Sequence, residues 1–197
     1  MDSLMQFLSG PWARISLLVP ALLSFGIYSG MNKSADSKGM NLMTRLDHKI
    51  PFLPAFSIPY LLHFPYVLFV LLVGILHSPY FAQIAAGTIA IQLASAAIFR
   101  WRQSHVPRPP VDGKGVFSRL VRMIYRLDRP YCTFPSQHVA YSVICAYWST
   151  LILPGLASYF MILTSAIVAS TLFLKQHALA DVAGGLSLAA VCAYVIG

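Results

Sequence analysis

The 197-residue sequence contains no glutamate, and only 10% of its residues are charged, whereas 57% are hydrophobic. Soluble globular domains carry about 25% charged residues, so this composition excludes an ordinary soluble protein and indicates an integral membrane protein. With six acidic residues in all, the sequence offers no carboxylate cluster of the kind that holds a magnesium ion. No metal or cofactor is expected, and the missing carboxylate cluster agrees with this.

Cysteine is also scarce. The three cysteines are odd in number and lack the spacing of a metal site. Two of them, Cys145 and Cys192, fall in apolar stretches, where cysteine commonly acts as a small packing residue. The N-terminal apolar stretch is preceded by a single basic residue, Arg14, and has no clear cleavage site, so we interpret it as a membrane helix and not as a removed signal peptide.

Hydrophobic stretches dominate the rest of the chain. A helix that crosses a bilayer needs about 20 mostly apolar residues, and six stretches have or nearly have this length. The sequence therefore predicts an all-α polytopic membrane protein, a bundle of six transmembrane helices that forms one domain over residues 1–197. The expected spans are 11–30, 57–77, 79–99, 137–153, 155–174 and 178–197.

The net charge of +8 is concentrated in two long polar connections, residues 31–56 and 100–135. With six spans, thirteen of the fourteen Lys and Arg residues lie on one side, Lys38 among them. The positive-inside rule assigns this face to the cytoplasm of a plasma or inner membrane. Because the cations are not interleaved with aromatic residues on a soluble surface, we expect anionic headgroups and phosphate substrates as partners and no nucleic acid.

Within the second connection, residues 116–127 have the pattern of a basic amphipathic helix, with arginines at helical spacing on one face and apolar residues on the other. Such a helix lies at the headgroup boundary and could guide a lipid to a site. The alternative is a solvated loop helix with an ordinary charged face. The three arginines are Arg119, Arg122 and Arg126.

Near the C-terminus, His177 and Asp181 stand four residues apart, which places both side chains on one face of a helix. Asp181 is the only carboxylate inside a hydrophobic stretch, and an ionisable group at membrane depth is costly enough to indicate a function. It can accept the histidine N–H and fix the ring tautomer. The alternative is a plain helix start with Asp181 at the positive end of the helix dipole.

The small pair Gly184-Gly185 predicts close helix packing.

A second polar group opens the fourth span, at Pro135-Ser136-Gln137-His138. Proline suits the start of a helix, and the serine can cap it. The unpaired backbone N–H groups that follow make a helix N-terminus a ready site for an anion. His138 would then stand in the first turn, beside the bound anion. Alone, the pattern would favour a cap followed by an interfacial histidine; the stretch at 170–181 reverses this preference.

Together these residues resemble the motifs of the type 2 phosphatidic acid phosphatases, a superfamily of membrane lipid phosphatases and lipid phosphotransferases. The family motif Pro-Ser-Gly-His is similar to Pro135–His138. The family motif Ser-Arg-x5-His-x3-Asp is similar to the segment that carries Ser170, His177 and Asp181. The resemblance covers residues 100–185 well and implies that the active-site motifs lie there.

The sequence departs from these motifs at two positions. Gln137 stands where glycine is usual, and Thr171 replaces the arginine of the third motif. A phosphoryl-transfer site needs positive charge around the phosphate oxygens, and Lys175 could supply it. Equally, Lys175 could be an interfacial residue whose ammonium reaches the headgroups.

The family's first motif, Lys-x6-Arg-Pro, has two candidate matches. Arg108-Pro109 lies at the usual distance from the second motif, whereas Arg129-Pro130 has Arg122 at the motif spacing in place of lysine. Arg108 is slightly favoured as the phosphate clamp, and Arg129 remains a candidate. The expected substrate-binding residues are Arg108, Arg129, Ser136, Gln137, Ser170 and Lys175.

The resemblance implies a lipid phosphatase, acting on a phosphatidate or a polyprenyl phosphate, that needs no metal. His177 attacks phosphorus to form a phosphohistidine, with Asp181 supporting its ring. His138 protonates the departing lipid alkoxide and then activates water. The alternative is a phosphotransferase that passes the phosphoryl headgroup to an alcohol. A non-catalytic lipid carrier is disfavoured, because a protein that only binds lipid needs no paired histidine and aspartate. The sequence allows either a monomer or a homo-oligomer.

Overall fold

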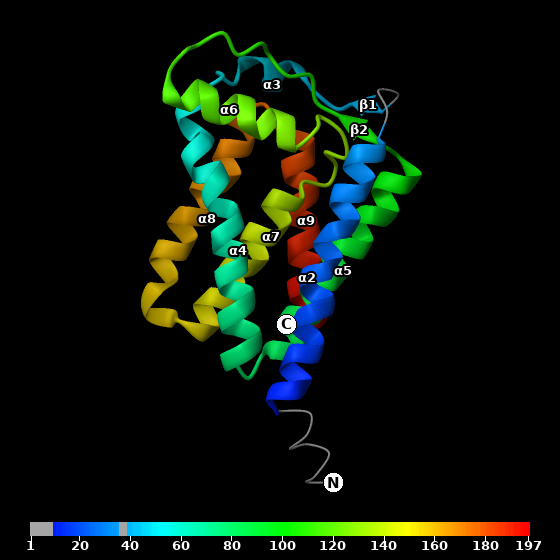
Figure 1. The fold of residues 1–197 in the computed structure, drawn as a ribbon, viewed down its shortest axis with the longest axis vertical. Helices are drawn as coiled ribbons and strands as arrows, with labels where there is room; N and C mark the ends of the chain where they lie inside the picture. The colour runs from blue at the N-terminus through cyan, green and yellow to red at the C-terminus, as the bar shows by residue number, and fades with distance from the viewer. Residues whose placement is uncertain (1–9, 36–38) are drawn as a thin grey trace.

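The computed structural model of the protein describes residues 10–35 and 39–197, so Lys38 and the first nine residues of the expected domain lie outside the described residues. Six long helices stand side by side in a bundle (Figure 1). The all-α fold is therefore confirmed. The bundle consists of α2 (Pro11–Ser34), α4 (Ser57–His77), α5 (Phe81–Trp101), α7 (Gln137–Ile152), α8 (Ala157–Phe173) and α9 (Leu179–Ile196).

Among the helices in the described part of the chain, five are long and apolar enough to cross a membrane. They are α2, α4 with the short η1 (Pro54–Phe56) before it, α5, α8 with η2 (Pro154–Leu156) before it, and α9. The sixth, α7, has 16 residues, or about 24 Å, which is shorter than the hydrocarbon core of about 30 Å. Its crossing of the membrane stays a prediction.

Helix α7 lies inside the bundle, where it packs against α4, α5, α8 and α9. Eleven of its 16 residues are buried. Its apolar core residues Tyr141, Ile144 and Trp148 belong to one cluster with Leu71 and Ile75 of α4. The first turn of α7 is thereby fixed at one end of the bundle, where it opens toward the polar connections.

Both basic connections meet at that end of the bundle, as the six-span arrangement predicts (Figure 1). The two-residue strands β1 (Met40–Asn41) and β2 (Ser104–His105) pair in parallel and join the connections to each other. Above the bundle end lie the short α3 (Arg45–Lys49) and the helix α6 (Val116–Leu127). Of the apolar face of α6, Val121 and Ile124 are buried in one cluster with Tyr60 of α4. Phe117 and Leu127 of the same face are exposed, as are Arg119 and Arg126.

The close approach of α9 to the start of α7 depends on glycine. A Cβ atom on Gly185 would lie 2.5 Å from the Ser136 carbonyl oxygen, and one on Gly184 would lie 2.6 Å from the ring of Phe134. Both distances are shorter than real Cβ contacts, so a larger residue would force the backbone apart at Gly185 or displace the Phe134 ring at Gly184. The close packing expected at Gly184-Gly185 is confirmed, and it brings the second and third motifs side by side.

Candidate active site

A short turn between α8 and α9 carries His177. Lys175 adopts a left-handed backbone conformation, with φ of 52°, which reverses the chain. The next two backbone N–H groups, those of Gln176 and His177, both donate to the carbonyl oxygen of Thr171, at 2.9 and 3.1 Å. At the start of α9, Asp181 Oδ2 accepts the backbone N–H three residues before it at 2.8 Å. The turn is thus fixed at both ends.

The side chains of His177 and Asp181 face each other within this turn. The distance from His177 Nδ1 to Asp181 Oδ2 is 3.5 Å, and the two side chains are 6% and 0% exposed. This is longer than an ordinary hydrogen bond, but such contacts often tighten only when substrate is bound. With Nδ1 directed at the carboxylate, Nε2 is the ring nitrogen left to reach a substrate.

The first turn of α7 lies directly beside this pair. Ser136 caps the helix, because its Oγ accepts the Val139 N–H at 3.3 Å, and its own N–H donates to the Asp181 carbonyl at 3.0 Å. One turn of α7 therefore holds His138 with its ring centre 5.7 Å from that of His177. Within the described part of the molecule, His138 Nε2 is buried without a hydrogen-bond partner. The structure brings both imidazoles to one point.

Arg108 reaches the same point from the connection before α6. Its guanidinium donates to the Asp128 carbonyl at 2.6 Å and to the side-chain oxygen of Gln176, and it stacks over Tyr125 with 4.5 Å to the ring centre. Burial raises the pKa of Tyr125 to about 12, so this ring stays neutral beneath the cation.

Two N–H donors of the Arg108–Gln176 pair make no hydrogen bond to the described residues. Arg108 Nε and Gln176 Nε2 are buried and have no partner among the described residues. Buried donors are seldom left unpaired. Gln176 directly precedes His177 in the chain, and Arg108 is hydrogen-bonded to Gln176. The arrangement can supply positive charge and N–H groups to the oxygens of a phosphate.

The other two predicted cations are directed elsewhere. Arg129 is exposed, donates to the Lys33 carbonyl at 2.5 Å and stacks over Tyr131. The ammonium of Lys175 donates to two backbone carbonyl oxygens of the α3 segment, at 2.8 and 2.6 Å, and burial lowers its pKa. Each cation is thus bound to backbone carbonyls and does not point at the two histidines.

Two further predicted residues use their polar groups inside the bundle. Ser170 donates its hydroxyl to the Ile167 carbonyl at 2.6 Å, one turn back in α8. Gln137 donates its side-chain amide to Gln92 of α5 at 3.2 Å. At the position of the missing motif arginine, Thr171 contributes its backbone carbonyl to the turn.

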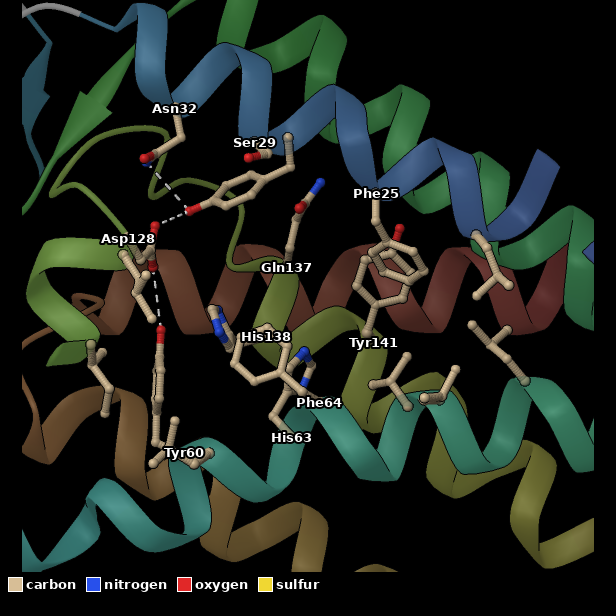
Figure 2. Close-up of a pocket in the computed structure, with 18 of the residues that line it drawn as sticks. Phe25, Ser29, Asn32, Tyr60, His63, Phe64, Asp128, Gln137, His138 and Tyr141 are labelled. Atoms are coloured by element: carbon tan, nitrogen blue, oxygen red, sulfur yellow. Dashed lines mark hydrogen bonds between the residues drawn. The ribbon is translucent and has the colours of Figure 1, made fainter. Parts of the chain in front are cut away.

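A cavity of about 470 Å³ opens on the other side of His138, between α2, α4 and α7 (Figure 2). Its wall is largely apolar. At the end near α6, the Asp128 carboxylate accepts hydroxyl groups from Tyr28 and Tyr60, at 2.6 and 3.3 Å. The apolar lining residues include Leu22, Phe25, Phe64, Val67, Leu68 and Leu71.

Three residues of the site are missed by reasoning from the sequence. Tyr60 and His63 of α4 each place a ring 4.6 Å from that of His138, and Gln176 holds Arg108. The signal available for Gln176 is its position beside His177 in a motif. For the two α4 residues the only signal is a polar group in an apolar span, and such residues usually pack within a core.

A sequence model of the PAP2 superfamily matches residues 89–196, which is more than half of the chain. The chain belongs to the PAP2 superfamily. The match includes α7, α9 and the turn between α8 and α9. It therefore includes His138, His177 and Asp181. Membership in PAP2 supports a phosphatase or phosphotransferase activity on lipid phosphates. No curated protein and no solved structure matches the chain.

Proposed function

We propose that this PAP2 protein hydrolyses a lipid phosphate through a phosphohistidine intermediate. The observation that carries the proposal is the convergence of two buried histidines from distant parts of the chain, with 5.7 Å between their ring centres. Behind one of them, His177, stands the buried carboxylate of Asp181. A histidine backed by a carboxylate can act as a nucleophile, and a second histidine nearby can act as acid and base.

The reaction has two steps. In the first, His177 Nε2 attacks phosphorus, the N–P bond forms, and the P–O bond to the lipid alcohol breaks as His138 donates a proton to the leaving oxygen. In the second, His138 takes a proton from water, whose oxygen attacks phosphorus and releases phosphate from His177. Asp181 holds the ring in one tautomer and stabilises its positive form in both steps.

We propose Arg108 as the phosphate clamp. Its Nε, the Gln176 amide and the backbone N–H groups at the start of α7 can bind the phosphoryl oxygens, where negative charge builds up. In this proposal, Gln176 and Arg108 together take the role of the motif arginine, whose position is occupied by Thr171 in this sequence. Arg129 is bound to α2 and so takes no part in this arrangement.

The cavity supports a lipid as the substrate. It adjoins His138, the proposed proton donor to the leaving alcohol, and its largely apolar wall suits the chain of that alcohol. We propose that the basic end of the bundle, which carries the site, faces the cytoplasm. The expected substrates are phosphatidate or a polyprenyl phosphate, hydrolysed without a metal ion.

A phosphotransferase is the second candidate. The cavity beside His138 has room for an alcohol in the position that water takes in hydrolysis. Phosphorus-labelled phosphatidate and polyprenyl phosphate, supplied to the purified protein with and without an alcohol acceptor, distinguish the two. We expect free phosphate without an acceptor and no loss of rate in a chelator. A strict requirement for the acceptor would establish the transferase instead.

The nucleophile is tested with His177→Ala. We expect this variant to bind lipid phosphate but to release none, and rapid acid-free quenching of the wild-type protein should trap label on a histidine. If His177→Ala turned over at the wild-type rate, the catalytic assignment would be wrong.

A further inference from the structure

The cavity contains a second imidazole that the proposed reaction does not use. His63 of α4 is 6% exposed, and its ring lies 4.6 Å from the ring of His138 (Figure 2). Its Nδ1 lies 2.9 Å from the hydroxyl oxygen of Ser142, which fixes the direction of the ring. Its other nitrogen, Nε2, is therefore the one available to a ligand in the cavity.

The cavity wall around this nitrogen is mostly apolar. Besides His63, the α4 part of the cavity wall consists of five apolar residues and one tyrosine: Leu61, Phe64, Val67, Leu68, Leu71 and Tyr60, whose hydroxyl is bonded to Asp128. A polar group enclosed by such side chains is destabilising unless something forms a hydrogen bond with it. A hydrocarbon chain in the cavity would leave Nε2 without a partner. A ligand with an oxygen atom at this point would satisfy it.

We propose that His63 is a specificity residue that binds a second oxygen of the leaving lipid alcohol, on the carbon next to the one that carried the phosphate. The proposal rests on the function proposed above and names the substrate class: a glycerol-based lipid phosphate. His138 binds the ester oxygen, and the short distance between the two rings requires that the group at His63 be a close neighbour of that oxygen.

The two substrate classes differ at that neighbouring carbon. In phosphatidate it carries an ester oxygen, and in lysophosphatidate it can carry a free hydroxyl. In a polyprenyl phosphate or a simple alkyl phosphate it carries only carbon and hydrogen. Sites that form a hydrogen bond to a substrate discriminate strongly against analogues that lack the bonding group, because the polar group of the protein is left unpaired.

The test compares kcat/KM for lysophosphatidate with that for dodecyl phosphate, using wild-type protein and His63→Phe. Phenylalanine keeps an aromatic ring in the wall but removes the nitrogen. We expect the wild-type preference for lysophosphatidate to fall about tenfold in His63→Phe. His63→Gln, whose amide can reach the position of Nε2, should retain most of the preference.

A matched control is His77→Phe, the same substitution at the exposed far end of α4. We expect His77→Phe to keep the wild-type ratio. Ser142→Ala, which frees the His63 ring, should lower the ratio by less than His63→Phe does. His63→Gln separates hydrogen bonding from a general loss of packing at the same position, and His77→Phe controls for the loss of an α4 histidine as such.

The outcomes separate the two proposals. If wild-type protein cleaves both phosphates and His63→Phe lowers both values of kcat/KM equally, the role of His63 is refuted while the hydrolase stands. A wild-type preference for dodecyl or polyprenyl phosphate would also refute it. If wild-type protein cleaves none of the substrates, the proposed function itself fails.

Discussion

The two halves of this molecule make different contributions to one site. Every residue proposed to act on phosphorus comes from the later part of the chain, between Arg108 and Asp181, within the PAP2 match. The cavity wall comes largely from α2 and α4, which precede that match. His138 is the point where the two parts meet. On the proposed function, the reaction and the choice of lipid would be encoded in separate stretches of sequence.

The two parts also differ in how their side chains are held. In the later part, hydrogen bonds fix the turn that carries His177, the capped start of α7 and the guanidinium of Arg108. In the earlier part, most side chains of the cavity wall are apolar and pack without directional bonds. Substitutions in the first set should therefore change turnover, and substitutions in the second should change the preference among lipids.

The largest effect is expected for Asp181→Asn. Asparagine can still accept the N–H that starts α9, but it cannot balance the charge of the imidazolium, so we expect kcat to fall about 10³-fold. Single-turnover measurement of phosphohistidine formation would show the loss in the first step. The control is Asp112→Asn in the exposed loop before α6, which should stay within twofold of wild type. An unchanged kcat in Asp181→Asn would mean that the carboxylate only caps the helix.

A smaller effect is expected for Arg108→Lys, which keeps the positive charge but loses the planar guanidinium that donates to Gln176. We expect kcat/KM to fall about 10- to 100-fold. The matched variant Arg129→Lys should change it less than threefold, because Arg129 binds the end of α2. A larger loss in Arg129→Lys than in Arg108→Lys would show that Arg129, and not Arg108, is the phosphate clamp.

The helical bundle and the placement of His177 opposite Asp181 could be predicted from the sequence because their signals are local. Apolar length marks the spans, and the spacing of His177 and Asp181 places both on one face of a short segment. The resemblance to PAP2 motifs adds His138 from a distant segment. These features depend on few tertiary contacts, which is why sequence alone identifies them.

The rest depends on contacts between segments far apart. Arg108 and Arg129 are alike in sequence, each followed by proline, and only the packing of their loops directs one guanidinium to Gln176 and the other to α2. Likewise, Lys175 is close to His177 in the chain, but its left-handed backbone directs the ammonium to α3. The cavity position of His63 follows from how α4 packs on α7, which no local pattern encodes.

The contact between the second and third motifs can be weakened with Gly185→Ala. The added Cβ would meet the Ser136 carbonyl and the Val139 side chain, so α9 must shift away from α7 at a cost of about 1–3 kcal/mol. We expect a lower melting temperature in detergent and a several-fold lower kcat. Gly87→Ala in α5, where no atom lies within 4 Å of the new Cβ, should be neutral or stabilising by up to about 1 kcal/mol.

The smallest effect is expected where the first connection supports the catalytic turn. Asp47 accepts the backbone N–H of Leu179, at the start of α9, at 2.7 Å, and the N–H and hydroxyl of Thr44 at 2.7 and 2.6 Å. Burial raises the pKa of Asp47, but these hydrogen bonds more than offset it and hold the pKa below its ordinary value of 3.8. Asp47→Asn should therefore lower the free energy of unfolding by about 1 kcal/mol at pH 7.

The pH dependence separates this charge effect from a simple loss of packing. Because the folded pKa of Asp47 is lowered, its contribution is complete above pH 3.8 and is lost as the pH falls through the folded value. Melting temperatures of wild type and Asp47→Asn should therefore differ at pH 7 and converge below pH 3.8. A difference that stayed constant over this range would show that the carboxylate contributes shape and not charge, and that the first connection supports the turn by packing alone.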